Sequence, residues 1–315
     1  AAMVVLCAVC AGAETYGDYE YRVFDSSTVE ITKYIGSAEK VDIPKKINGK
    51  SVTKIDWFAF RECTRLTSVA IPNSVTSIGD CAFSGCESLT NITIPGSVTS
   101  IGNSTFGGCT SLTVINVAAG NQNYVSVNGV LYNKGKTELI CYPAEKKGNN
   151  YKILDSVTSI GSSAFSGCAS LKSITIPSSV TKIGWYAFKG CTSLTSIAIP
   201  DSVTEMGWAV FDGCKSLTSI VIPDSLTEIG DSTFRNCERL TSITIPDGVI
   251  SVGKCAFQNC KNLTSITIPD GVTSIGCHAF QDCKSLASIT IPGNVMEIEW
   301  YAFKGCTSLT SITIP

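Results

Sequence analysis

A pattern of 23 residues recurs along most of this chain of 315 residues. One copy, LTSITIPDGVTSIGCHAFQDCKS, runs from Leu263 to Ser285, and the next begins at Leu286. Repetition at a fixed period of this size is typical of solenoids, in which each unit buries its apolar groups only against its neighbours. The repeat therefore predicts one continuous solenoid rather than the two globular domains that the length alone would allow.

A repeated phenylalanine gives the register of the units. Steps of 23 residues separate its members within two blocks, which are Phe60, Phe83 and Phe106, and then Phe165, Phe188, Phe211, Phe234, Phe257, Phe280 and Phe303. The longer gap between the blocks predicts an irregular coil at about residues 118–152. Within it, Asn128-Gly129 between alternating apolar residues is a strong hairpin signal. We expect this coil to project a hairpin or a widened loop from the solenoid, with Ile153 resuming the register.

Two short strands are expected in each unit. In the copy above, the pattern L-x-x-I-x-I predicts a strand with Ile266 and Ile268 on its buried face, and Pro269 ends that strand because it lacks an N–H donor. Val272 and Ile275 predict a second short strand, and the segment from Ala279 onward a compact helical or 3₁₀ corner. The predicted fold is a right-handed curved stack with a parallel β-sheet of L-x-x-I-x-I strands on its concave face.

The two ends of the chain differ from the repeats. Residues 1–13 form an apolar run that ends in Ala11-Gly12-Ala13, which predicts the remainder of a secretory signal peptide. Residues 14–50 alternate apolar and polar side chains around a turn, which predicts an N-terminal β-hairpin cap. The repeats occupy residues 51–315 and stop at Pro315 in the middle of a unit, so we expect the natural chain to continue.

Composition excludes several classes of function. Only 16% of the residues are charged and the net charge is −2, so no basic surface is available for nucleic acid or for an anionic membrane. The apolar run at the start is too short to span a membrane. His278 is the single histidine, so every serine–histidine or cysteine–histidine mechanism would have to use it. We therefore expect no enzyme, no catalytic residue and no cofactor.

Ten of the sixteen cysteines lie three residues after the repeat phenylalanine. Stacking in register would hold equivalent Cβ atoms about 4.8 Å apart and parallel, whereas a disulfide needs about 3.8 Å and converging Cβ atoms. This ladder is therefore interpreted as small buried filler. Cys255 and Cys277, in neighbouring units, are open to a disulfide, or with His278 to zinc, although the spacing matches no known metal motif. No metal site is predicted there. Aspartates after the repeat proline are interpreted as turn residues rather than calcium ligands.

Tryptophan placement is more informative about function. Trp57, Trp185, Trp208 and Trp300 all lie three residues before the repeat phenylalanine, in a slot that elsewhere holds Asp, Asn, Ser, Lys or Cys. A core position would not accept that set, so the slot is expected to face solvent. Trp185-Tyr186 with Trp208 predicts one exposed aromatic patch, and Trp300-Tyr301 a second. Exposed aromatics anchor protein interfaces and stack on sugars, or they simply cover the turn beneath them.

The outward residues of the predicted sheet are a second candidate surface. Columns of hydroxyl groups, including Thr241, Thr244, Thr264 and Thr267, would follow the L-x-x-I-x-I strands. Such a sheet is able to bind an extended partner, or the threonines are merely solvent cover compatible with a β-strand. Their uniformity favours the tryptophan slots and the hairpin loop as the specific sites.

The pattern I-P-x-S-V-T-S-I-G-x-x-A-F-x-G-C-x-S-L-T-S-I-T, nearly unbroken over residues 71–93 and 176–198, resembles the BspA-like leucine-rich repeat family. The resemblance covers nearly everything after residue 15. It implies a curved leucine-rich-repeat solenoid of secreted or surface proteins that adhere to host or matrix proteins, and it transfers no catalytic residue. The sequence thus predicts a non-enzymatic, secreted or cell-surface binding module for an extracellular protein or glycan. The alternative is a spacer that presents a downstream domain.

Overall fold

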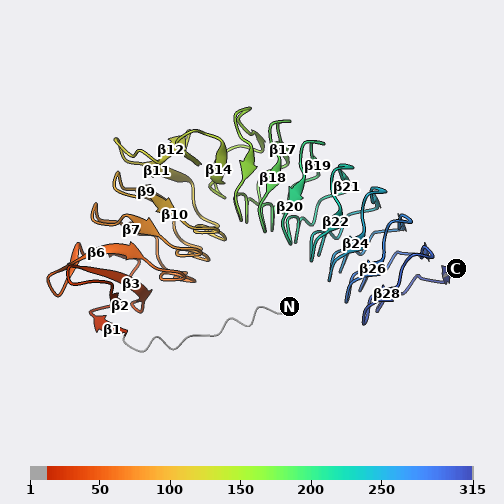
Figure 1. The fold of residues 1–315 in the computed structure, drawn as a ribbon, viewed down its shortest axis with the longest axis horizontal. Coiled ribbons are helices and arrows are strands. Elements are labelled where there is room, and N and C mark those ends of the chain that lie inside the picture. Colours follow the sequence, from red (N-terminus) through yellow and green to blue (C-terminus); the bar gives the residue numbers. More distant parts are fainter. Residues whose placement is uncertain (1–12, 314–315) are drawn as a thin grey trace.

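The computed structural model describes residues 13–313 and shows an arc of stacked coils (Figure 1). These residues form strands β1–β29 and no helix. Equivalent residues of adjacent coils, such as Ile197 and Ile220, pair in parallel register 23 residues apart. The predicted parallel solenoid is confirmed. Apart from Ala13, the expected signal segment lies outside the described residues.

Each regular coil contributes two short strands. In one coil, β19 (Ser196–Ala198) is followed by β20 (Glu205–Met206). Ile197 is buried between two exposed neighbours, so only one face of β19 contributes to the core. Pro200 ends the first segment, and its carbonyl accepts the N–H of Val203 at 3.0 Å, which closes the turn toward the second strand.

The strands of successive coils form two columns. The longer strands are β4 (Lys40–Asp42), β7 (Ser68–Ala70), β9 (Asn91–Ile94), β11 (Val114–Val117), β15 (Asn150–Lys152), β17 (Ser173–Thr175), β19, β21 (Ser219–Val221), β23 (Ser242–Thr244), β25 (Ser265–Thr267), β27 (Ser288–Thr290) and β29 (Ser311–Thr313). The two-residue strands are β8 (Ser77–Ile78), β10 (Ser100–Ile101), β16 (Ser159–Ile160), β18 (Lys182–Ile183), β20, β22 (Glu228–Ile229), β24 (Ser251–Val252), β26 (Ser274–Ile275) and β28 (Glu297–Ile298). Figure 1 shows the two-residue strands nearer the inner edge of the arc and the L-x-x-I-x-I strands nearer the outer edge.

The sheet of L-x-x-I-x-I strands was expected on the concave face, but it lies nearer the outer edge, and turns form the inner edge (Figure 1). In the turn after β18, the N–H groups of Tyr186, Phe188 and Gly190 donate to carbonyls of the next coil at 2.8 to 2.9 Å, whereas those of Lys189 and Cys191 donate within the coil. Tyr186 and Gly190 have φ of 58° and 71°. A helix requires negative φ throughout, so this alternation replaces the helical or 3₁₀ corner that the sequence suggested. It also satisfies the backbone donors of these five residues.

Stacked aromatic rings fill the centre of the coils. Neighbouring repeat phenylalanines lie with ring centroids 5.1 to 5.9 Å apart and nearly parallel. The cysteine ladder runs beside them: Cys191 Sγ, for example, donates to the carbonyl of Phe165 at 3.2 Å. Burial of one such large side chain contributes about 1.5 to 3 kcal/mol to the stability of the fold. A coil gains this stabilisation only when a neighbouring coil covers the side chain.

The irregular coil contains the expected hairpin but does not project it. Strands β12 (Tyr124–Val127) and β13 (Val130–Asn133) pair antiparallel around Asn128-Gly129, both at positive φ. Strand β13 then pairs with β14 (Glu138–Cys141), and Leu131 is fully buried. The hairpin is therefore part of the sheet, because its apolar residues complete the core of this coil.

Tyr142 takes the place of the missing repeat phenylalanine. Its ring stacks on Phe165 with centroids 5.2 Å apart, and its N–H donates to the carbonyl of Ala164 at 2.7 Å. The register thus resumes at Tyr142, ahead of Ile153. Only Ile140 and Cys141 separate Leu139 from Tyr142, so this coil has no full corner turn.

An antiparallel hairpin begins the described chain. Strands β1 (Glu14–Tyr16), β2 (Tyr19–Val23) and β3 (Thr28–Tyr34) pair in sequence order. Strand β3 then pairs in parallel with β6 (Lys50–Ile55), which also pairs with the short β5 (Lys46–Ile47) and, in parallel, with β8 of the next coil. Tyr34 stacks on Phe60 at 5.2 Å, so the hairpin covers the first phenylalanine of the stack.

Candidate functional site

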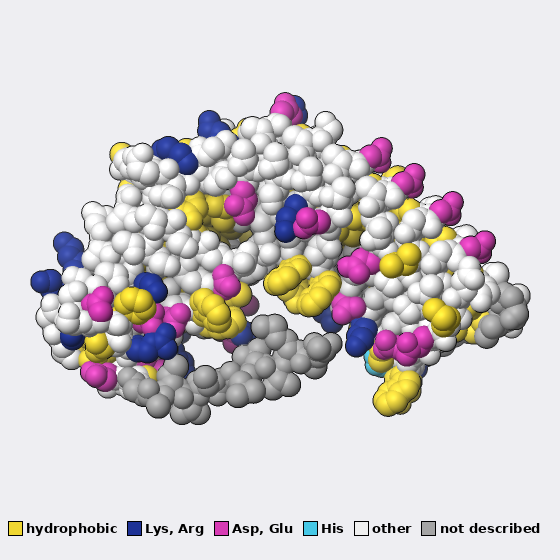
Figure 2. Space-filling view, viewed as in Figure 1, with side chains coloured by type: hydrophobic (Ala, Val, Ile, Leu, Met, Phe, Trp, Pro, Cys, Tyr) yellow, Lys and Arg dark blue, Asp and Glu magenta, His cyan; other side chains and the backbone are white. Residues whose placement is uncertain are grey.

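All four tryptophans are exposed in turns that follow the inner strands. The exposed fractions of Trp57, Trp185, Trp208 and Trp300 are 65, 52, 53 and 81%. Figure 2 shows hydrophobic side chains gathered at the inner edge of the arc, below β18 and β20. The solvent-facing slot inferred from the sequence is therefore confirmed, whereas a binding role for these residues stays a prediction.

Trp185 and Trp208 form the aromatic patch expected from consecutive coils. Their ring centroids are 5.7 Å apart and the rings are 14° from parallel. Trp185 lies against Gly207 of the next coil, where an added Cβ would be 2.6 Å from the Trp185 backbone nitrogen. Glycine before this slot therefore leaves space for the Trp185 indole, whereas Glu299 stands at the equivalent position of the last coil, where the preceding coil has Cys277 instead of tryptophan. The two stacked indoles are therefore held as a rigid pair, so less side-chain conformational entropy is lost on binding.

A groove of about 560 Å³ opens beside Trp185. Lys182 and Glu205 form an ion pair of 2.8 Å on its wall. The rest of the lining includes Thr204, Met206 and Glu228. The groove therefore combines an indole with fixed hydrogen-bond donors and acceptors, which suits a ligand that has both an apolar face and a polar rim.

The predicted threonine columns are present but lie apart from the tryptophans. Thr241, Thr244, Thr264 and Thr267 are exposed, on or beside the strands nearer the outer edge. Thr264 Oγ1 donates to the carbonyl of Thr241 at 3.2 Å, so this hydroxyl serves the stack itself. Thr244 pairs directly with Thr267 across β23 and β25. The sheet and the tryptophan turns are consequently two separate surfaces.

The cysteines described by the structure are free thiols. Cys255 and Cys277 are partly exposed, and the N–H of Cys255 donates to the carbonyl of Cys277 at 2.9 Å. Burial is the main cause that raises the pKa of the Cys255 thiol. Within residues 13–313 no three histidine, cysteine or acidic side chains are grouped as metal ligands. His278 instead stacks on Tyr301 with centroids 5.3 Å apart.

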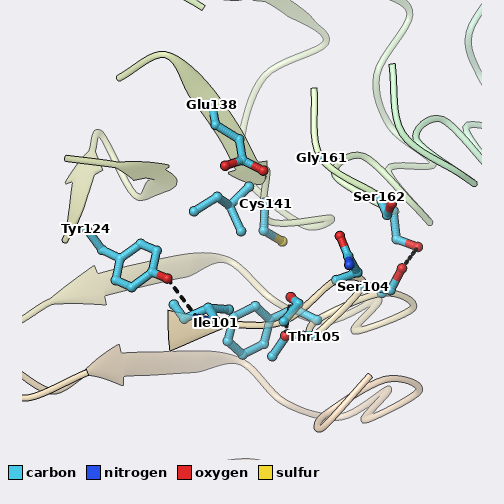
Figure 3. A pocket seen from close by; sticks show the side chains of 14 residues that line it. Ile101, Ser104, Thr105, Tyr124, Glu138, Cys141, Gly161 and Ser162 are labelled. Carbon is cyan, nitrogen blue, oxygen red and sulfur yellow. Dashed lines mark hydrogen bonds between the residues drawn. The ribbon is translucent and has the colours of Figure 1, made fainter. Parts of the chain in front are cut away.

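A small hollow marks the coil that lacks its corner (Figure 3). Its volume is about 60 Å³, and Tyr124, Glu138 and Cys141 line it. Ser104 and Ser163 also line it, and their Oγ atoms are 2.8 Å apart, so the turns of the two flanking coils touch. Burial raises the pKa of the Glu138 carboxyl. A hollow of this size is large enough for water but too small for a larger ligand.

Sequence reasoning missed the cations beside the aromatic turns. Arg61 lies over the ring of Phe58 at 5.1 Å, and Lys189 over that of Tyr186 at 5.1 Å. Lys304 lies over the ring of Tyr301 at 4.9 Å. A comparison of the coils could have found them, because each cation directly follows the repeat phenylalanine.

None of the described segments is a helix that is long and apolar enough to cross a membrane.

Comparison with known proteins agrees with this architecture. A family model described as BspA type leucine rich repeat region, with six copies, matches residues 33–133, 141–263 and 205–315. The crystal structure of a leucine-rich repeat protein from Eubacterium ventriosum is 27% identical, with 95% of each chain covered and a TM-score of 0.70. A leucine rich cell surface protein from Faecalibacterium prausnitzii is 29% identical, with 96% of this chain and 94% of that chain covered and a TM-score of 0.52.

A leucine-rich repeat protein from Bacteroides ovatus is 27% identical over 96% of this chain and 88% of that chain, with a TM-score of 0.52. No curated protein matches the chain. The family model covers most of the chain. The chain belongs to the BspA-type leucine-rich repeat family.

Proposed function

We propose that this protein is a non-enzymatic binding module of a secreted or cell-surface protein, which engages an extracellular protein or glycan through the inner edge of its arc. The observation that carries the proposal is the stacked, exposed pair of Trp185 and Trp208 beside an open groove. Large exposed aromatics held rigidly are typical anchors of interfaces. The name of the Faecalibacterium prausnitzii relative supports a location at the cell surface.

The threonine sheet is the competing surface on the same molecule. Its side chains are uniform from coil to coil, and its hydroxyls donate to carbonyls of the preceding coil. A surface of this kind offers affinity for an extended partner but little selectivity. Variants on each surface therefore distinguish the two.

A binding screen against matrix proteins and glycans tests the proposal. Suitable variants are Trp185→Ser and Trp208→Asp, because Ser162 and Asp231 occupy the same slot in neighbouring coils and the turn accepts them. Thr267→Ala is the matched variant on the sheet. We expect the tryptophan variants to lose at least about tenfold in affinity, as for an interface hot spot, and Thr267→Ala to bind normally. Unchanged binding in both tryptophan variants would refute this site. An unaltered protein that binds nothing in the screen would favour the spacer role.

A further inference from the structure

Three coils share a five-residue motif at the inner edge. The motif is Trp, then Phe or Tyr, then Ala-Phe, then Lys or Arg, and it occurs at residues 57–61, 185–189 and 300–304. We call each copy an aromatic–cation module. Trp208 is not part of one, since Ala209 and Asp212 stand at the second and fifth positions of its turn.

The three modules have the same geometry. The second residues, Phe58, Tyr186 and Tyr301, have φ of 59°, 58° and 61°. The cation three residues later lies 4.9 to 5.1 Å from the centre of that ring. Cation–π attraction contributes about 0.5 to 1 kcal/mol at exposed sites, so each module keeps its ring and its cation together.

The tryptophan of a module is also held from below where the next coil supplies a glycine. A Cβ on Gly79 would lie 2.7 Å from Trp57 Cδ1, and a Cβ on Gly207 would lie closer still to Trp185 Cδ1. In the third module, Tyr301 packs on His278. The aromatic surface is therefore preformed, so little order has to be gained on binding.

The modules lie along one edge at distances that suit a long ligand. From the second module to the third the phenylalanine stack makes five steps of 5.3 to 5.6 Å, or roughly 27 Å along the stack. Between the first and second modules, Ser104 contacts Ser163 directly, so the irregular coil adds no turn at the inner edge. Four steps from coil to coil therefore separate these two modules. No single small ligand spans such intervals.

Charges around the modules favour an uncharged ligand. Arg61 pairs with Glu62 at 3.0 Å, and Lys189 lies 4.0 Å from Asp212. Glu299 directly precedes the third tryptophan. Carboxylates offset the cations at the first and third modules, and at the second the buried Asp212 offsets part of the charge of Lys189 and Arg235, so a polyanion would meet repulsion as well as attraction. Sugar rings have an apolar C–H face for the indole and hydroxyls that both donate and accept.

We propose that the three aromatic–cation modules bind one unbranched, uncharged polysaccharide at three points along the inner edge of the arc. This inference rests on the proposed binding function and specifies its ligand. Three linked sites raise the local concentration of the polymer at each unoccupied site. The gain over a single site is about 100-fold or more when the ligand is long enough to span them.

Binding of defined polysaccharides to the whole chain tests the inference. The probes are amylose, linear β-1,3-glucan, β-1,4-xylan and β-1,4-mannan, each as a long polymer and as its tetrasaccharide, with heparin as the anionic comparison. The variants are Trp57→Ser, Trp185→Ser, Trp300→Ser and their triple combination. Lys254→Ser is the control, because Lys254 is exposed in the same slot between the second and third modules. Circular dichroism verifies that each variant is folded.

We expect at least one neutral polymer to bind about 100-fold tighter than its tetrasaccharide. Each single tryptophan variant should lose part of that gain, the triple variant should lose all binding, and the control should bind normally. The inference is overturned if only heparin binds, if polymer and tetrasaccharide bind equally, or if Trp57→Ser and Trp300→Ser have no effect. Loss of matrix-protein binding in Trp185→Ser, without binding of any polysaccharide, would reject the polysaccharide and retain the binding function.

Discussion

Two glycines of one coil should differ sharply in their tolerance of alanine. Gly207 has an ordinary φ, but an added Cβ would lie 2.6 Å from the backbone nitrogen and 2.8 Å from the Cα of Trp185. Glu299 in the same slot of the last coil shows that the backbone can shift to admit a Cβ, but at Gly207 the Trp185 indole would have to move as well. Gly213 has φ of +77°, and its nearest atoms to an added Cβ are 3.7 Å away. Gly207 is needed for space, whereas Gly213 is needed for its conformation.

The expected free energies follow from these two causes. Gly213→Ala should destabilise the fold by about 1 to 2 kcal/mol, the strain of an L-residue in the left-handed region. Gly207→Ala should cost about 3 kcal/mol, the upper end for overpacking, because both the indole and the backbone of Trp185 would have to shift. Gly213→Asn is the matched control, since Asn236 and Asn259 occupy that slot in other coils at φ of 60°. It should be close to neutral.

Urea unfolding followed by circular dichroism measures all three variants. The midpoint should fall in the order Gly213→Asn, Gly213→Ala, Gly207→Ala, with the last shift about 1.5 to 3 times the second. A Gly207→Ala variant as stable as Gly213→Asn would show that adjacent coils separate easily at the inner edge. The argument that the glycine holds Trp185 in place would then fail.

Three further predictions concern the core. Phe211→Ala removes a fully buried ring from the stack and should cost about 3 to 5 kcal/mol in urea unfolding; a cost below about 1 kcal/mol would contradict a continuous stack. Burial raises the pKa of Cys109 from 9.0 and of Tyr142 from 10.0, each to about 12. The unfolded chain therefore loses these protons at a lower pH than the folded chain, so the stability present below pH 9 should decline as the pH rises toward 12. A urea midpoint that does not change over this pH range would refute the prediction. Arg235→Ser should destabilise the fold by about 2 kcal/mol, because it removes hydrogen bonds of 2.7 and 3.1 Å to the buried carboxylate of Asp212. Adding Asp212→Ser should restore most of the urea midpoint. No recovery in the double variant would reject the ion pair as the cause.

Much of the candidate site was accessible from the sequence. The tryptophan slot was identified as exposed because unlike residues such as Asp80, Lys254 and Cys277 share it, and the stacking of Trp185 on Trp208 followed from their spacing of 23. The cations were missed because a single unit gives no sign that Lys189 lies over Tyr186. That contact depends on the reversal of φ in the turn.

The corner and the irregular coil were less predictable. A short segment such as Ala279-Phe280 fits a helical turn equally well, and only the bonds between coils select alternating φ instead. Tyr142 lies 23 residues before Phe165, so counting back from the second block would have identified it; it was missed because the inserted hairpin breaks the spacing from Phe106 and the ring is a tyrosine. Likewise, the alternating apolar residues of the hairpin indicate strands, but they do not indicate whether those strands project from the solenoid or pack against its core.

The sequence by itself determined the stack: a constant period of 23 aligns each phenylalanine, isoleucine and cysteine with its equivalent, and burial then requires neighbouring coils to pair in register. Only the tertiary structure decided which part of the coil faces the inside of the arc and how far apart the modules lie. Those properties arise from the sum of many small differences in spacing between the two sides of each coil, which no single repeat encodes.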